Sequence, residues 1–196
     1  MEIDDKSAPH SHLYLSQGKS PIVQQRLVQQ QEKIGPLGPL TLLILPKGWT
    51  KSSSSDNARG YCHRFSPSDN AKVSISVLYR VPPLSQSEAD ALKKLLKAGP
   101  HTLSDDDLKP LPHLLGDYRD ESVFKTEKAE VTAIGGKPVL SIQGHFLDDD
   151  VSVYTVYNPA SHDPRVVQQL QFNAPTAQYK KYASAARSAI LNASLH

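Results

Sequence analysis

The stretch Pro138–Phe172 constrains the fold more than any other part of the chain, because it predicts three β-strands in succession. Pro138–Leu147 and Val166–Asn173 alternate apolar and polar residues, and a period of two indicates a strand with one buried face. Val151–Asn158 lies between them and is rich in Val, Thr and Tyr, which suit a pleated surface. We therefore predict that these three strands lie side by side.

The two connections favour antiparallel pairing of these strands. Asp148–Asp150 is short enough for a hairpin loop, and Asn158–Pro164 is a turn-rich loop with two prolines. Parallel neighbours would need a crossover of about a dozen residues or more, which neither connection provides. The three strands thus form a meander, and its apolar face requires a covering layer.

The remaining elements are predicted from periodicity and helix caps. Ser85 and Glu88 have the spacing of a capping box, and Ser104 starts a second, shorter helix. A last helix runs from Thr176 to about Asn192 and has Tyr179, Tyr182, Ala186, Ile190 and Ala193 on one face. Further strands are expected at Leu40–Leu45, Tyr61–Ser66, Val73–Arg80 and Val123–Val131, with a polar loop at Lys51–Gly60. The fold class is α+β: an antiparallel sheet of about six strands with helices packed on it.

Gly35–Pro39 divides the chain into two parts. Residues 1–37 are expected to form a flexible N-terminal arm, in which Ile22–Ile34 can be helical or extended, or can dock on a partner. Residues 38–196 have the size of one α+β domain.

Composition excludes several classes of function. The net charge is +2, too small to favour nucleic acid, and the longest apolar run, Leu40–Leu45, is too short to span a bilayer. Met1–Lys6 shows no apolar signal region, and Cys62 is the single cysteine, so no disulfide can form within the chain. We expect a cytoplasmic protein.

The polar side chains of the meander are the main candidates for a binding site. Gln143, His145, Gln169 and Gln171 can form a flat hydrogen-bonding surface, with Tyr154 beside them. Antiparallel sheets also commonly leave one polar face to water, so an ordinary solvated face is the alternative. A partner would have to bury about 800 Å² on this side to form a stable complex.

Other motifs are better explained by structure than by chemistry. The Asp148–Asp150 triplet suits a hairpin tip, and adjacent carboxylates cannot all face one cation. Cys62 and His63 are neighbours on a strand and point to opposite faces, so His63 is a poor base for the thiol. We expect no catalytic residues, no metal site and no cofactor.

Several short stretches match the pattern of a known family. They are Leu45–Trp49, Arg64–Pro67, Val73–Arg80, Ile134–Pro138, Tyr154–Tyr157 and Gln168–Phe172. In this order they resemble the PsbP and Ran-binding Mog-type family over about Gly38–Asn192. The resemblance implies an α/β/α sandwich and a binding module rather than an enzyme. It brings no catalytic residues, and the missing transit segment argues against a photosystem role in the lumen.

Three functions remain open on these grounds. The first is a non-catalytic protein-binding module, a bacterial adaptor, chaperone or immunity-type protein linked to a secreted effector. The second is a small-molecule or lipid carrier with a pocket between sheet and helices. The third is a hydrolase-type enzyme that uses His63, His145 and a hairpin aspartate. A roomy apolar cavity would favour the carrier, and ionisable groups clustered in a cleft would favour the enzyme.

Overall fold

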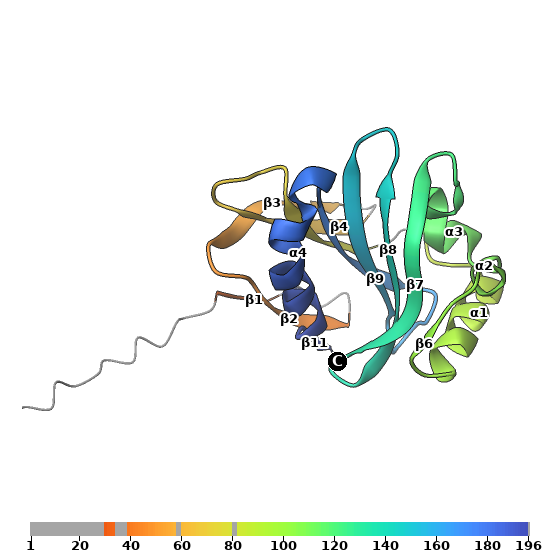
Figure 1. Ribbon diagram of the computed structural model, residues 1–196. Helices are drawn as coiled ribbons and strands as arrows, with labels where there is room; N and C mark the ends of the chain where they lie inside the picture. Colours follow the sequence, from red (N-terminus) through yellow and green to blue (C-terminus); the bar gives the residue numbers. More distant parts are fainter. Residues whose placement is uncertain (1–29, 34–38, 58–59, 80–81, 196) are drawn as a thin grey trace, which may run out of the picture.

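The computed structural model describes residues 30–33, 39–57, 60–79 and 82–195. A main sheet of eight antiparallel strands has helix α4 on one face and the helices α1, α2 and α3 on the other (Figure 1). A small sheet of three strands lies on the α4 side.

The main sheet has the strand order β3-β4-β5-β10-β9-β8-β7-β6. Its strands are β3 Trp49–Asn57, β4 Gly60–Pro67, β5 Ser74–Tyr79, β6 His101–Thr102, β7 Phe124–Ile134, β8 Lys137–Phe146, β9 Val151–Pro159 and β10 Val167–Pro175. The small sheet contains β1 Gln31–Lys33, β2 Leu40–Ile44 and β11 Ser194–Leu195. The helices are α1 Gln86–Lys97, α2 Asp105–Leu108, α3 Pro112–Leu115, the 3-10 helix η1 Gly116–Arg119, and α4 Thr176–Leu191.

The predicted meander is confirmed. β8, β9 and β10 are neighbours in the sheet and pair antiparallel, with Gln143 opposite Tyr154 and Tyr154 opposite Phe172. β10 also pairs with β5, so it joins the meander to β3, β4 and β5. The sheet is therefore continuous from β3 to β6.

The expected count of about six strands was wrong, because the described main sheet has eight. The predicted polar loop Lys51–Gly60 is instead mostly strand β3, which pairs with β4. Serine is a weak strand former, but backbone pairing with β4 and the hydrogen bond from Ser52 Oγ to the carbonyl of Arg64 hold it extended. The short edge strand β6 was also missed, and the predicted strand Leu40–Leu45 joins the small sheet as β2.

Part of the predicted N-terminal arm is ordered next to the domain. Gln31–Lys33 is extended and pairs antiparallel with β2, so this part of the Ile22–Ile34 segment is a strand and not a helix. Residues 1–29 and 34–38 lie outside the described residues.

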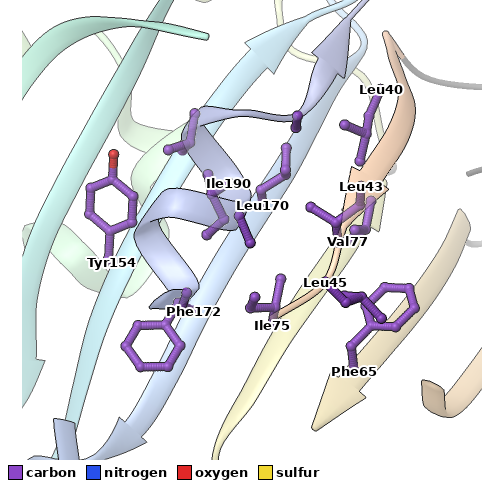
Figure 2. Packing of buried hydrophobic residues seen from close by; sticks show 14 of the residues in the cluster. Leu40, Leu43, Leu45, Phe65, Ile75, Val77, Tyr154, Leu170, Phe172 and Ile190 are labelled. Atoms are coloured by element: carbon purple, nitrogen blue, oxygen red, sulfur yellow. The ribbon is translucent and has the colours of Figure 1, made fainter. Parts of the chain in front are cut away.

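The core on the α4 side lies under α4 and β2. Figure 2 shows Leu43 of β2, Leu45 just after this strand, and Ile190 of α4 beside the apolar side chains of β4, β5 and β10. The predicted apolar face of the last helix is confirmed: Ala186 and Ile190 are buried, and Tyr179 and Tyr182 pack against the same core. Trp49 is also buried there, 4% exposed, with its ring centroid 6.5 Å from that of Phe172.

The second core lies between α1, α3 and the strands β7, β8 and β9. Leu92 of α1 and Leu114 of α3 are buried against Leu140 and Ile142 of β8 and Tyr157 of β9. Ser85 caps α1 as predicted, because its hydroxyl accepts the amide hydrogen of Glu88. Among the side chains that the structure describes, none from β3, β4 or β5 belongs to this core.

Substituting Trp49 tests the core on the α4 side of the sheet. Trp49→Ala should lower the free energy of unfolding by about 3–5 kcal/mol, because a large buried ring is replaced by a cavity. Urea denaturation measures this loss. Leu147→Ala is the matched control, since Leu147 is exposed and its removal should change stability by less than about 0.5 kcal/mol. Equal losses for the two variants would place the indole outside the core.

Substituting Gly144 tests the packing of β7 on β8. A methyl group there would meet the carbonyl oxygen of Lys125 and lie 2.6 Å from Cζ of Phe124. We expect Gly144→Ala to cost about 1–3 kcal/mol of stability, the usual effect of overpacking. Thr126→Ala, an exposed position opposite Gly144, should cost less than about 1 kcal/mol. A neutral Gly144→Ala variant would contradict this packing.

Candidate functional site

The five predicted binding residues do not share one face. Gln143 pairs with Tyr154, so these two side chains and His145 lie on the α4 face, with the core residue Phe172. Gln169 pairs with Tyr157, which belongs to the second core, so Gln169 and Gln171 point to the opposite face. The expectation of one flat surface was therefore wrong. Alternation within each strand was identified correctly, but the phase between β8 and β10 was not.

The residues on the α4 face form a closed network of contacts. Glu127 accepts a hydrogen bond from Nε2 of Gln143 at 2.9 Å and contacts Nδ1 of His145 at 3.3 Å. Arg187 of α4 donates to Oε1 of Gln143 at 3.1 Å, and its guanidinium lies 4.6 Å from the ring centroid of Tyr154. These contacts link α4 to the meander, and most of the polar groups of these residues already have hydrogen-bond partners within the protein.

A bulge in β7 creates this network. The pairing of β7 with β8 shifts by one residue between Thr126 and Lys128, which leaves Glu127 as the extra residue.

Tyr179 of α4 is near the same network. Burial raises the pKa of Tyr179 to about 12, and Arg187 offsets only part of this effect.

Gln169 and Gln171 line a cleft between the sheet and the α1–α3 layer. The cleft consists of two adjoining cavities of about 870 and 230 Å³ that share Gln169 as a lining residue. The walls of the larger cavity are mainly apolar and contain Leu78, Tyr79, Pro82, Pro83, Leu84 and Pro112. The smaller cavity is lined by Leu115, Asp117, Tyr118, Phe146 and the two glutamines.

Glu88 is the one carboxylate in the wall of the larger cavity. It is 3% exposed and accepts hydrogen bonds from the backbone amides of His113 and Leu114 at the start of α3, and from the hydroxyl of Ser85. Burial alone would raise the pKa of Glu88, but the bonds from His113, Ser85 and Leu114 outweigh it and lower the pKa below the ordinary value. The charge is therefore satisfied internally and serves to join α1 to α3.

Beyond the cleft, the same face of the sheet is polar. The register places Arg64 opposite Ser76 and Ser76 opposite Gln171, and the row continues through Thr155 to Ile142. A parallel row runs from Ser74 through Asn173 to Val153. Side chains thus change from polar to apolar between β9 and β8 in the first row and between β10 and β9 in the second. We call the polar part, formed by Arg64, Ser66, Ser74, Ser76, Gln171 and Asn173, the polar half-face.

The helices α1 and α3 pack on the apolar part of this face; within the polar half-face, Ser66, Ser74 and Ser76 are buried, whereas Arg64, Gln171 and Asn173 are partly exposed. α1 packs on β8, and α3 packs on α1 and η1. Figure 1 shows α1, α2 and α3 at the β6–β8 end of the sheet, away from β3 and β4. The polar half-face and the cleft beside it therefore form the candidate site.

The geometry does not assemble the hydrolase-type site. His63 is on β4 and His145 on β8, four strands away, which corresponds to about 19 Å. Cys62 and His63 point to opposite faces, and burial raises the pKa of Cys62 while Arg64 offsets only part of the rise. Among the described residues, no group of three or more His, Cys, Asp or Glu side chains could hold a metal ion. None of the described helices has the length and apolar character needed to cross a bilayer.

Sequence reasoning missed the residues that extend this site beyond the meander. Arg64 alternates with the core residue Phe65, and Ser74 and Ser76 alternate with Ile75 and Val77. This alternation was a usable signal for a polar face. It could not show that β5 lies next to β10, which is what brings these residues to Gln171.

Comparison with known proteins shows the fold. No protein-family model and no curated protein sequence matches the chain. The cyanobacterial PsbP protein CyanoP from Synechocystis sp. PCC 6803 has a similar structure, with a TM-score of 0.53 and 8% identity over 85% of this chain and 92% of that chain. A Pseudomonas aeruginosa protein of unknown function matches with a TM-score of 0.42 and 14% identity, over 83% and 94% of the two chains. The chain has a PsbP-like fold.

Glu88→Gln tests the junction between α1 and α3. At about pH 7 the variant should be less stable by about 1–3 kcal/mol, because hydrogen bonds to a charged group become bonds to a neutral one. The folded pKa of Glu88 lies below its ordinary value of 4.5, so the stabilising effect is complete above 4.5 and is lost as pH falls through the folded pKa. Denaturation from about pH 7 to pH 3 should show the two proteins converging.

The exposed Glu121 provides the control for this pH series. Glu121→Gln should follow the wild-type stability to within about 0.5 kcal/mol at every pH. A stability gap for Glu88→Gln that stays constant down to acidic pH would contradict an ionised Glu88 at this junction.

Proposed function

We propose that the protein is a non-catalytic binding module that holds an extended segment of a partner protein in the cleft. The observation that carries this proposal is the position of Gln169 and Gln171. They lie on the same face of β10, and Nε2 of Gln169 donates to Oε1 of Gln171 at 3.3 Å. Gln169 lines both adjoining cavities, and Gln171 lines the smaller one. Two of the predicted binding residues thus form the floor of a recess.

The chemistry of the cleft suits a peptide chain. A side-chain amide both donates and accepts hydrogen bonds, as does each peptide group of an extended segment. The apolar wall, which includes Tyr79, Pro82 and Pro83, can bury apolar side chains of that segment. Glu88 is already occupied by α3, so this wall presents no free carboxylate to repel an acidic ligand.

The finer assignment follows the resemblance to the PsbP and Mog-type family. In this proposal the chain is a member of that family and serves in a bacterial cytoplasm as an adaptor, chaperone or immunity-type protein of a secreted effector. The PsbP-like fold supports the family, and the cleft supports the binding role.

A small-molecule or lipid carrier is the second candidate. The larger cavity, about 870 Å³, falls within the range of small-ligand pockets and has apolar walls. Its floor contains Gln169, which is 5% exposed and donates to Gln171, and a purely apolar ligand would offer no hydrogen-bond partner to the rest of this amide. The peptide is therefore the better match.

Selection from a library of random peptides tests the proposal. The wild-type protein should enrich peptides with apolar residues, and the Gln169→Ala, Gln171→Ala double variant should bind them about tenfold or more weakly, because two hydrogen-bonding groups are lost. Fluorescence anisotropy of a labelled enriched peptide gives the dissociation constants.

The matched control removes the two polar residues of the other face. Gln143→Ala with His145→Ala should leave peptide affinity unchanged, since both positions lie on the α4 face. Equal loss of binding in the two double variants would contradict the cleft as the site. If no peptide is enriched and fatty acids raise the melting temperature instead, the carrier replaces the peptide-binding module.

A further inference from the structure

Arg64 has an unusual position in the sheet. It is the only Lys, Arg, Asp or Glu in the sequences of β4, β5 and β10. Its side chain points away from the core that contains Phe65, towards the polar half-face. Ser76 lies between Arg64 and Gln171 on the neighbouring strands and is 9% exposed. The positive charge of the Arg64 guanidinium thus lies among neutral polar side chains.

The guanidinium has hydrogen-bonding capacity to spare. Nε of Arg64 is buried and meets no hydrogen-bond acceptor among the described residues, and no described carboxylate forms an ion pair with this side chain. Burying a charged donor without an acceptor is costly. Charged side chains are seldom buried in proteins unless they are paired.

We propose that Arg64, together with Ser76, binds a carboxylate of the partner segment that occupies the cleft. This inference rests on the proposed function and specifies the partner chemistry: a peptide segment that combines apolar residues with an aspartate or glutamate. The fork of a guanidinium matches the two oxygens of a carboxylate. The hydroxyl of Ser76, opposite Arg64 on β5, can donate to one of the remaining lone pairs.

A carboxylate fits this site better than a phosphate group. A dianionic phosphate is normally held by several cations or by a helix N-terminus, whereas the three strands carry one cation, and the helix that follows β10, α4, packs on the opposite face of the sheet. Asp117 lines the smaller cavity, and its carboxylate disfavours a second negative charge there. The acidic residue of the segment therefore belongs at the Arg64 end.

The register sets the spacing between the two contacts. Arg64 and Gln171 lie two strands apart, about 10 Å. A peptide that crosses these strands in an extended form rises roughly 3.3 Å per residue. The acidic residue should therefore stand about three residues from the residue that contacts Gln171.

Two peptide libraries test this inference. One contains all residues, and in the other Asn and Gln replace Asp and Glu. From the first, the wild-type protein should enrich peptides with an acidic residue at the stated spacing, and their amide counterparts should bind about tenfold or more weakly. Arg64→Gln should bind the acidic and amide peptides equally, with its melting temperature measured as a check on folding. Arg64→Lys keeps the charge without the fork and should retain a reduced preference.

Lys180→Gln supplies the control, since Lys180 is an exposed cation on α4, on the opposite side of the sheet. It should keep the full preference for acidic peptides. Peptides that need Gln169 and Gln171 but show no acidic preference would overturn the role of Arg64 and leave the proposed function standing. Loss of the proposed function would instead appear as no enrichment from either library. A dimer of this chain that Arg64→Gln dissociates would make a second copy the occupant and also overturn the inference.

Discussion

The two-sided character of β10 is the constraint on which this structure depends. One side of the strand presents Leu170, Phe172 and Ala174 to the core beneath α4, and the other presents Gln169, Gln171 and Asn173. Because β10 pairs with both β5 and β9, it lies where the polar strands meet the apolar strands of the second face. The α4 side must be covered along most of the sheet, whereas the other side needs a cover only from β9 onward. The short α1–α3 layer supplies this cover.

The cleft follows from this incomplete layer. Where the helical layer ends, a cleft remains between its edge and the sheet. This cleft is lined by Pro82, Pro83 and Pro112 on the side of the layer and by Gln169 on the side of the sheet. Glu88 of α1 stabilises the helical wall of this cleft, because its carboxylate accepts the amide hydrogens at the start of α3. On the α4 side, Arg187 and Glu127 already hydrogen-bond to the side-chain amide of Gln143. The same residue type therefore has a structural role on one face and is available for binding on the other.

Much of the architecture could be predicted from the sequence, because its signals are local. The alternation and short loops of the meander, the Ser85 cap of α1 and the apolar face of α4 were all confirmed. The serine-rich strand β3 was missed because its pairing with β4, rather than its own composition, keeps it extended. The site could be predicted only in part: alternation identified Gln169 and Gln171 as polar, but which face Gln143 shared with them depended on pairing across strands. Arg64 was missed because β5 lies between it and the meander.

Thiol labelling gives the most direct test of a sheet face that is half covered. In a Cys62→Ser background, Gln171→Cys and Ile142→Cys place thiols in the same cross-strand row, one within the polar half-face and one beneath the α1–α3 layer. The account predicts that the Gln171→Cys thiol reacts rapidly in the native protein, whereas the Ile142→Cys thiol reacts only through opening of the fold and is slower by orders of magnitude. Equal protection of both thiols would show that the polar half-face is covered and would contradict the account.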